Sequence, residues 1–321
     1  MSQGVRIVAV EPDDDEALAT HVAIRNAVTP DSPESVDHVR WENRTYPGQV
    51  FRLHALAPDG RAVGTGSTGR IWMHDSAYER YWLGLWVPAG QRRQGTGTAL
   101  LAALSEIARE NGKRGFQTEL FETHADGHAF LAHRGFVEIG RTKLVRLDLA
   151  GLEPPAALMP AGLTITSLEA RPDLVPSIHR VALEAFPDIP AADEPVSALA
   201  YDEFVARDVE PDDVPRAAFM LAVDDATDEV VGYANLRYAP GSTTLAWHDM
   251  TAVRPAYRGR GLALALKQAT IAWAIGAGLE ALETGNDAEN APMRAVNARL
   301  GYRPIPDSVD LRGPLVQAPP A

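Results

Sequence analysis

The sequence contains no cysteine among its 321 residues. Disulfide bonds, a thiolate nucleophile, and zinc or iron–sulfur sites built on thiolates are therefore excluded. Long apolar runs are also missing, since no stretch approaches the roughly 18 consecutive apolar residues of a membrane helix. The first ten residues lack the basic and apolar regions of a signal peptide. We therefore expect a cytoplasmic protein with no membrane partner.

Positive charge is scarce, because 30 Lys and Arg residues stand against 43 Asp and Glu residues. The formal net charge of -13 repels a polyanion, so nucleic acid is not an expected partner. The same field favours a cationic small molecule such as an amine, although an acidic balance is also a common route to solubility. The 45% apolar and 23% charged content is typical of a folded globular protein.

Two glycine-containing segments are alike at a fixed distance along the chain. Residues 87–97 and 253–263 share the pattern Arg-x-x-Gly-x-small, and their arginines Arg92 and Arg258 are separated by 258 − 92 = 166 positions. The same offset relates Gly112 to Gly278, Thr118 to Thr284, and Gly135 to Gly301. A constant offset over about fifty residues indicates an internal duplication.

A segment rich in proline, glycine and alanine, 151–162, separates the two copies and has no helical or strand period. The duplication therefore predicts two domains, 1–150 and 163–321, joined by this linker. In each copy β-prone stretches precede a long helix that starts at the glycine motif, and in the first copy this helix should stop at Asn111-Gly112. Each domain is predicted to be α/β or α+β, with a mixed sheet flanked by helices.

The repeated glycine motif lies where a strand is expected to end and the long helix to begin. Small residues let the backbone approach a ligand, and the first helical turn offers unpaired N–H groups at the positive end of the helix dipole. The motif therefore predicts a pyrophosphate site. A dinucleotide fingerprint fits less well, because that motif opens with Gly-x-Gly after the first strand of a βαβ unit.

Both copies resemble the GNAT superfamily of N-acetyltransferases, whose coenzyme A motif is Gln/Arg-x-x-Gly-x-Gly/Ala between the fourth strand and the third helix. Arg92-x-x-Gly95-x-Gly97 and Arg258-x-x-Gly261-x-Ala263 both match it. The segment 290–302 is also similar to the Asn…Gly-Phe ending of many members. The resemblance covers nearly the whole chain, and the layout is similar to two-domain members such as mycothiol synthase.

The resemblance implies acetyl-CoA (coenzyme A) as cofactor, with one set of binding residues in each copy. In the second copy the set is Val253, Arg258, Gly259, Arg260, Gly261, Leu262, Ala263 and Asn290. In the first copy it is Val87, Arg92, Arg93, Gln94, Gly95, Thr96, Gly97 and Thr98. It also implies that the fourth and fifth strands splay around the pantetheine arm and that the amine attacks the thioester directly. A backbone N–H between Met250 and Ala252 is expected to hold the thioester oxygen.

Carboxylates on the fourth and fifth strands are the candidates for accepting the amine's proton, since an alkylamine is mostly protonated at neutral pH. In the second copy these are Asp249 and Glu283, with His248 as a third choice. Each is also explained as a solvated or ion-paired strand residue. The first copy offers only Glu119 and Glu122 on the strand after its glycine motif.

Many GNAT enzymes protonate the leaving thiolate with a tyrosine four residues before the last glycine. That position holds Asn297 in the second copy and Leu131 in the first. Asn297 retains hydrogen-bonding groups for the coenzyme, whereas Leu131 has none. His124 also replaces the asparagine found at Asn290. These differences predict that the second domain carries the chemistry.

The main hypothesis is an acetyl-CoA-dependent N-acetyltransferase that acts on a primary amine of a small molecule. The alternatives are a non-catalytic acyl-CoA-binding or regulatory protein and a protein lysine acetyltransferase. No metal site is expected, because His124 and His128 have helical spacing but no further ligand. The protein is expected to be a monomer or a homodimer.

Overall fold

The computed structural model describes residues 4–30, 32–46, 48–74, 76–190, 196, 198 and 200–317. The chain divides into two compact units: unit 1 is Met1–Gly140 with Val309–Ala321, and unit 2 is Arg141–Ser308. Each copy of the repeat thus supplies most of one unit, but the strand that ends each copy contributes to the sheet of the other unit. The boundaries predicted from the repeat stay a prediction, and residues 151–160 contain no helix or strand.

The sheet of unit 1 has the strand order β1-β2-β3-β4-β5-β13. The strands are β1 (Arg6–Val10), β2 (Val50–Leu56), β3 (Ala62–Arg70), β4 (Arg80–Trp86), β5 (Gly115–Phe121) and β13 (Ser308–Pro314). Neighbours from β1 to β4 are antiparallel, and β4 and β5 are parallel. Unit 1 therefore has the mixed sheet that the sequence predicts.

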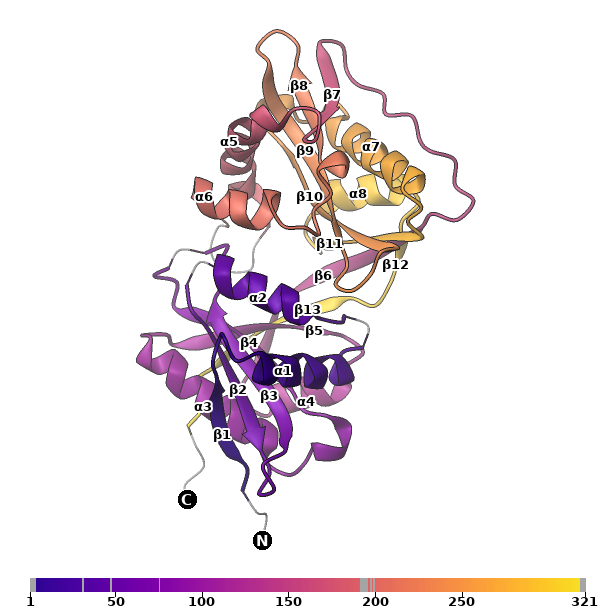
Figure 1. The fold of residues 1–321 in the computed structure, drawn as a ribbon. Helices are drawn as coiled ribbons and strands as arrows, with labels where there is room; N and C mark the ends of the chain where they lie inside the picture. Colours follow the sequence, from indigo (N-terminus) through magenta and orange to yellow (C-terminus); the bar gives the residue numbers. More distant parts are fainter. Residues whose placement is uncertain are drawn as a thin grey trace. The chain divides into compact units, whose positions relative to one another are not determined.

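Four helices of unit 1 cover the two faces of this sheet. They are α1 (Asp15–Val28), α2 (Val36–Thr45), α3 (Thr96–Glu110) and α4 (Ala125–Ala132). α1 and α2 lie on one face, and α3 and α4 lie on the other (Figure 1). The buried face of α3, with Leu100, Leu104 and Ala108 at helical spacing, packs on the core of the sheet.

Unit 2 repeats this arrangement with the strand order β6-β11-β10-β9-β8-β7, and β12 pairs with β6. The strands are β6 (Val137–Asp148), β7 (Leu163–Ser167), β8 (Met220–Asp224), β9 (Glu229–Tyr238), β10 (Leu245–Val253), β11 (Ala281–Asp287) and β12 (Arg303–Pro304). β10 and β11 are parallel, whereas β6 to β11 and the pairs from β7 to β10 are antiparallel.

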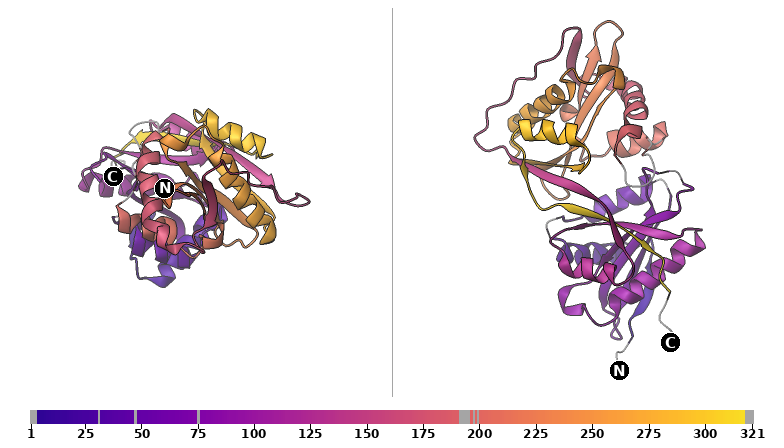
Figure 2. Two further views of the ribbon diagram at one scale, coloured as in Figure 1. Left: turned by 90° about the horizontal axis from the view of Figure 1, so that it is seen from above. Right: turned by 180° about the vertical axis from the view of Figure 1, so that it is seen from behind.

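The helices of unit 2 are α5 (Val175–Ala185), α6 (Tyr201–Phe204), α7 (Leu262–Gly276) and α8 (Ala291–Arg299). Figure 2 shows α5 and α6 on one face of the unit 2 sheet and α7 and α8 on the other. A π-helical turn, Val205–Val209, directly continues α6. α7 is buried along Leu262, Leu266 and Ile271, so it anchors the turn that precedes it.

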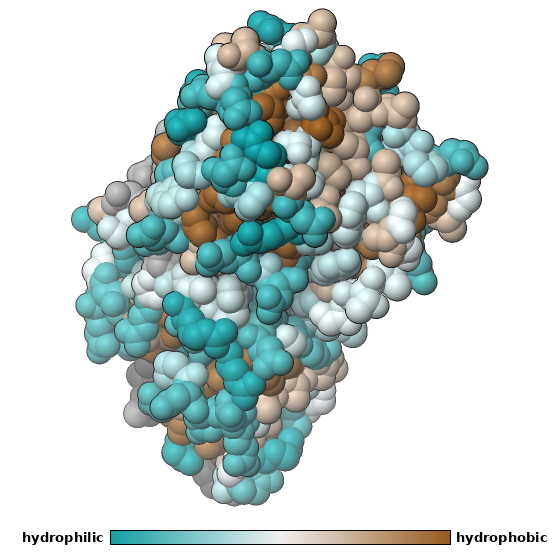
Figure 3. Space-filling view, turned by 45° about the horizontal axis from the view of Figure 1, so that its top comes forward, coloured by the Kyte–Doolittle hydropathy of each residue, from teal (hydrophilic) through white to brown (hydrophobic). Residues whose placement is uncertain are grey.

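On the face shown in Figure 3, brown hydrophobic patches are interrupted by teal hydrophilic surface. Large hydrophobic side chains that are exposed include Val137, Leu152, Leu158, Leu183 and Tyr201. In the part of the chain that the structure describes, none of the helices combines the length and apolar character needed to cross a membrane.

Candidate active site

The parallel strands β10 and β11 stay paired over only part of their length. Their register pairs Leu245 with Ala281, Ala246 with Leu282 and Trp247 with Glu283, after which the strands separate. The Thr284 hydroxyl of β11 donates to the His248 carbonyl of β10 at 3.0 Å, at the vertex of the opening. Unit 2 therefore contains a V between its parallel strands.

Unit 1 has the same opening between β4 and β5. Pairing runs from Arg80 with Gly115 to Trp82 with Gln117 and then ends. Across the vertex the Thr118 hydroxyl donates to the Leu83 carbonyl at 2.7 Å. The splay expected from the resemblance is thus present in both units, and it makes Leu83 the counterpart of His248.

A β-bulge distinguishes β10 from β4. His248 is opposite Leu236 and Thr251 is opposite Ala234, so Asp249 and Met250 together face the single residue Asn235. No register shift interrupts the pairing of β3 with β4 in unit 1. The bulge adds one residue, so the repeat offset is 165 from Leu83 to His248 (248 − 83) and 166 from Val87 to Val253 (253 − 87).

The side chain of Asn235 holds the bulge. Its Oδ1 accepts the Met250 N–H at 3.1 Å, and its Nδ2 donates to Asp249 Oδ2 at 3.1 Å. Asn235 is 2% exposed, so it reaches the bulge from the buried side of the sheet. The Met250 amide, one of those expected to hold the thioester oxygen, is therefore engaged with Asn235. Asn235 is not recognisable from the sequence, because a bulge becomes visible only from the pairing with β9.

The glycine turns of the two units share the same internal geometry. Gly95 and Gly261 have φ values of 87° and 86° and precede the first residues of α3 and α7. A Cβ atom at either glycine would meet no atom within 4 Å. These turns therefore leave open space in front of the first helical amides, where a diphosphate is expected to bind.

The motif arginines donate to their own turns. Arg92 Nε is 3.0 Å from the Val87 carbonyl, and Arg258 Nε is 3.0 Å from the Val253 carbonyl. Gln94 and Arg260 also reach back four residues, to the carbonyls of Gly90 and Ala256. The guanidinium groups of Arg92 and Arg258 thus hold the shape of the turns, in addition to any charge that they offer a ligand.

The two turns differ in the residue that follows this arginine. Arg93 has φ 60° in unit 1, whereas unit 2 has Gly259 with φ 73° at the same place. The left-handed conformation is unfavourable for a residue with a Cβ and is free for glycine. The unit 2 sequence is therefore better adapted to the turn that both units form.

Helix α4 packs onto the first turn of α3 in unit 1. A Cβ atom at Gly97 would lie 3.1 Å from the Phe130 ring, and the Arg134 guanidinium lies 3.6 Å from the centre of that ring. Arg134 also donates to the Thr98 hydroxyl at 2.6 Å. Asp126 of α4 accepts from Arg92 at 3.1 Å. Side chains of α4 therefore fill the space beside the turn of unit 1.

The corresponding contacts are absent from the described part of unit 2 because the residue types differ. At the positions of Phe130 and Arg134, 166 residues further on, unit 2 has Val296 and Leu300. Arg258 pairs instead with Asp188, at 2.6 Å. Asn290 caps α8 by accepting the Met293 N–H at 3.3 Å, so its side chain orients the helix that flanks the V.

Asp249 belongs to a charged cluster on the α5 and α6 face of unit 2. Arg237 of β9 lies 3.5 Å from Asp249, donates to Asp213 at 2.9 Å, and donates to the Arg207 carbonyl at 2.9 Å. Arg237 thereby attaches the π-helical turn to the sheet beside the bulge. The Asp249 side chain remains one-third exposed, which leaves it accessible to a ligand.

Asp208 on the π-helical turn completes this cluster and was not singled out from the sequence. Its Oδ2 is buried and has no hydrogen-bond partner among the described residues. Burial, and secondly the charge of Asp249, raise the pKa of Asp208 to about 7, against the opposing effect of Arg237. A carboxyl group with a pKa near neutrality beside a second carboxylate is suited to proton transfer.

Glu283, the other predicted carboxylate, lies at the closed end of the V opposite Trp247. It accepts from Arg146 at 2.9 Å, and Arg146 also pairs with Asp148 at 2.8 Å. Glu283 is therefore paired with Arg146, and this ion pair competes with any role of Glu283 as a base.

Asn297 and His248 line the α7 and α8 side of the V. Asn297 is 2% exposed; it donates to Asn286 at 2.6 Å, and its Oδ1 has no partner in the described part of the chain. His248 is buried and contacts Tyr302 and Thr270. A buried amide oxygen without a partner is uncommon in folded proteins, so Asn297 Oδ1 marks a polar position on this side of the V.

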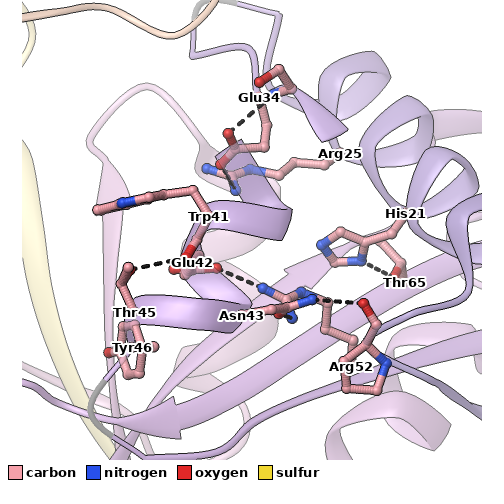
Figure 4. Close-up of polar contacts among 12 residues, drawn as sticks. His21, Arg25, Glu34, Trp41, Glu42, Asn43, Thr45, Tyr46, Arg52 and Thr65 are labelled. Atoms are coloured by element: carbon pink, nitrogen blue, oxygen red, sulfur yellow. Dashed lines mark hydrogen bonds and ion pairs between the residues drawn. The ribbon is translucent and has the colours of Figure 1, made fainter. Parts of the chain in front are cut away.

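The α1 and α2 face of unit 1 is closed by paired charges (Figure 4). Arg52 bonds to Glu42 at 2.6 Å and to Asn43 at 2.5 Å, and Arg25 pairs with Glu34 at 2.6 Å. Burial, with the nearby charges of Arg52 and Arg25, lowers the pKa of His21 to about 3, so this histidine is neutral. The Arg52 contacts fasten α2 to β2, and the Arg25 pair fastens α1 to the segment that precedes α2.

Comparisons with known proteins agree with this geometry. The model of the acetyltransferase (GNAT) family matches residues 19–136 and 176–302. The fold and the site define a tandem acyltransferase with two splayed sheets. The chain belongs to the GNAT acetyltransferase family, whose members use acyl-CoA, and it contains two GNAT regions.

Among curated proteins the chain is similar to mycothiol acetyltransferases. It is 28% identical over 214 residues to that of Pseudarthrobacter chlorophenolicus, which is 66% of this chain and 63% of the relative. It is 27% identical over 236 residues to that of Renibacterium salmoninarum, which is 71% of this chain and 66% of the relative. The similarity thus spans slightly less than two thirds of these relatives.

Solved structures show the same fold at low identity. A tandem GNAT protein from the clavulanic acid biosynthesis pathway has a TM-score of 0.76 and 22% identity, with 99% of both chains covered. A GCN5-related N-acetyltransferase from Sphaerobacter thermophilus has a TM-score of 0.71 and 18% identity, with 99% of this chain and 98% of that chain covered. The prediction of two tandem GNAT domains is confirmed.

Proposed function

We propose that this acetyltransferase moves an acetyl group, or another short acyl group, from coenzyme A to a primary amine of a small molecule, with the chemistry in unit 2. One observation supports it above all others: unit 2 combines an open glycine turn, a V between β10 and β11, and an accessible carboxylate, Asp249, in the bulge beside that V. The curated relatives are named for acetylation of a small molecule, which fits an amine acceptor.

Acetyl-CoA is the cofactor that the open turn fits best. Gly259 and Gly261 leave room before α7, and the first amides of that helix, from Leu262 and Ala263 onward, have no helical acceptor. They are suited to the diphosphate, while Val253, Arg258 and Arg260 shape the turn. Asn297 Oδ1 offers an acceptor to the pantetheine amides. When bound, the coenzyme supplies the activated acyl group.

The carboxylates on the opposite face are placed to receive the amine. Asp208, Asp213 and Asp249 face two guanidinium groups, so the cluster has an excess negative charge only when Asp208 is ionised, and an ammonium group that binds there favours this ionised form. Asp249, oriented by Asn235, takes the proton that the amine must lose before attack. Asp208 shares that proton with Asp249 because two neighbouring carboxylates do not both ionise freely.

Unit 1 has a supporting role in this proposal. Its turn residues Val87, Arg92, Arg93, Gln94, Gly95, Thr96, Gly97 and Thr98 form the same turn, but Phe130 and Arg134 pack against its helix. Its β4 lacks the bulge and its opposite face is closed by ion pairs. Coenzyme binding and turnover are therefore assigned to unit 2.

A thiol-release assay tests the proposed function. The full chain is given acetyl-CoA with a panel of primary amines that includes glucosamine, spermidine and tyramine, and a lysine-containing peptide is run in parallel. Amine-dependent release of free coenzyme A supports the proposal. Saturable binding of acetyl-CoA without release would favour a non-catalytic acyl-CoA-binding protein, and release with the peptide alone would favour a protein lysine acetyltransferase.

A further inference from the structure

A buried polar cluster in unit 2 occupies positions that are entirely apolar in unit 1. The cluster consists of His248, Lys267, Thr270 and Tyr302, each no more than 6% exposed. The counterparts in unit 1 are Leu83, Leu101, Leu104 and Phe136, all members of its apolar core. The same fold thus packs without polar groups at these places, so their presence in unit 2 needs another cause.

Matching contacts establish these correspondences. The hydroxyls of Thr118 and Thr284 bond to the carbonyls of Leu83 and His248, respectively. Leu101 and Lys267 are each five residues after the first residue of their helix, and Leu104 and Thr270 are eight residues after it. Phe136 and Tyr302 each donate a backbone N–H to the residue five positions earlier, Leu131 and Asn297.

Hydrogen bonds hold His248 in one neutral form. The Thr270 hydroxyl donates to the Lys267 carbonyl at 2.9 Å, so its oxygen accepts from His248 Nε2–H. The other ring nitrogen, Nδ1, then accepts the Tyr302 hydroxyl at 2.6 Å. Burial, and secondly the charge of Lys267, hold the pKa of His248 well below its usual range. His248 is therefore uncharged and is not a counterion for Lys267.

Lys267 is the member of the cluster without a counterion. It is 2% exposed, its ammonium lies 5.5 Å from the centre of the Tyr302 ring, and in the described parts of the chain it has no carboxylate partner. Burial alone lowers its pKa to about 7. A buried ammonium is costly unless an anion pairs with it. Leu101 shows that an apolar side chain fills this place.

The cluster lies at the vertex of the V. His248 is the first residue of β10 beyond the last pair with β11, and its carbonyl receives the Thr284 hydroxyl. Tyr302 is tied to Asn297, whose Oδ1 is buried without a partner among the described residues. The V is widest at the glycine turn and closes at this vertex. With its diphosphate at the glycine turn, coenzyme A would extend its pantetheine arm along the V and bring the thioester end to the vertex.

We propose that Lys267 provides the buried positive charge that stabilises the departing coenzyme A thiolate, a role that depends on the proposed function of unit 2. In the transfer step the amine nitrogen forms a bond to the acyl carbon, and the carbon–sulfur bond breaks. The electron pair of that bond stays on sulfur. The proton that the amine nitrogen loses on forming the amide goes to Asp249, whose earlier proton from the ammonium group has passed to solvent through its exposed side. The Asn297 amide donates hydrogen bonds but is not an acid that could protonate a thiolate, so stabilisation by charge replaces protonation by a neighbouring acid.

The thiol of bound coenzyme A provides a direct test that needs no acceptor. The ultraviolet absorbance of the thiolate is followed against pH for coenzyme A bound to the full chain. We expect the thiol pKa in the complex to lie at least about one unit below that of free coenzyme A titrated in the same buffer. Lys267→Met should abolish the shift. The affinity for acetyl-CoA, which has no free thiol, should change less than about threefold, because an uncharged thioester gains little from the charge of an ammonium group.

Two further variants complete the experiment. Lys267→Leu places the unit 1 residue at this position, so it should fold at least as well as the wild type and also lose the thiol shift. Arg299→Met removes an exposed charge of α8 and should leave the shift unchanged. A thiol pKa that is normal in the wild type, or still lowered in Lys267→Met, would overturn the role of Lys267. Unfolding of both Lys267 variants would contradict the comparison with Leu101. Absence of any coenzyme A binding by the wild type would instead remove the proposed function itself.

Discussion

Asn235 bonds to Asp249 at 3.1 Å across the β-bulge of unit 2, and the same side chain accepts the Met250 amide. One asparagine on β9 thus sets both the position of the proposed base and the shape of the strand that lines the V. Unit 1 has neither the bulge nor an aspartate in the corresponding strand, β4. The proposed base of unit 2 therefore depends on one extra residue in β10 and one polar partner in β9.

Replacing Asn235 should separate stability from coenzyme binding. Asn235→Leu leaves the Met250 N–H buried without an acceptor, which should lower the free energy of unfolding by about 1–3 kcal/mol. It should also lower kcat, because Asp249 loses its orientation, with little change in the affinity for acetyl-CoA. Denaturant unfolding and steady-state kinetics measure these effects. Asn111→Ala, which removes an exposed side-chain contact at the end of α3, is the control and should affect neither quantity strongly.

The two carboxylates that the sequence offers as bases should behave differently. Asp249→Asn removes the proposed proton acceptor and should lower kcat by about 10²-fold or more. Glu283→Gln breaks the ion pair with Arg146, so its main effect should be on stability, at most about 1 kcal/mol for this partly exposed pair. Steady-state kinetics of both variants with the same amine show which of the two carboxylates acts as the base. A larger loss from Glu283→Gln would transfer the role of base to that residue.

Local signals in the sequence predicted the glycine turns and the helices that follow them. The long helix ends at Glu110, directly before Asn111-Gly112 as predicted, because a left-handed glycine terminates a helix wherever it occurs. The glycine turn itself was likewise recognisable, since it depends on small residues at fixed spacing. These features depend on neighbours in the chain and are therefore visible without the fold.

The acceptor side could not be predicted in the same way. Asp208 lies about forty residues from Asp249 in sequence, on a π-helical turn that has no recognised pattern. Asn235 matters because it is opposite a bulge, and Lys267 matters because the fold buries it. Each of these properties arises from long-range pairing and packing, so a single sequence without a fold does not reveal them.

Stability should respond to pH through Asp208. Its folded-state pKa of about 7 lies above the usual aspartate value, so the folded protein binds more protons than the unfolded chain between about pH 4 and 7. Stability is therefore lost as pH rises through this window, by at most about 1.4 kcal/mol per pH unit. Asp208→Asn removes this loss, and the variant should gain stability relative to the wild type as pH rises.

Unfolding curves measured at several pH values check this expectation. Asp212→Asn is the control, because Asp212 is an exposed neighbour and its substitution should leave the pH dependence of the wild type unchanged. In kinetics, Asp208→Asn should also alter the pH profile of kcat/KM, because it removes a carboxyl group whose pKa of about 7 lies within the range of the measurement. Parallel stability profiles of the wild type and Asp208→Asn would show that Asp208 ionises normally.

Matched substitutions in the two glycine turns should locate coenzyme binding. Gly95 and Gly261 have nearly equal positive φ values and equally open surroundings, so Gly95→Val and Gly261→Val should carry a similar conformational cost of about 1–2 kcal/mol. Any difference between the two variants in their affinity for acetyl-CoA then shows at which turn the coenzyme binds. We expect Gly261→Val to weaken acetyl-CoA binding by more than about tenfold, since it removes well over about 1.4 kcal/mol of binding free energy, and Gly95→Val to leave it within error.

Calorimetric titration gives both affinities and the number of sites. Two sites in the wild type, with one lost in each variant, would show that Phe130 and Arg134 do not close the turn of unit 1 to the coenzyme.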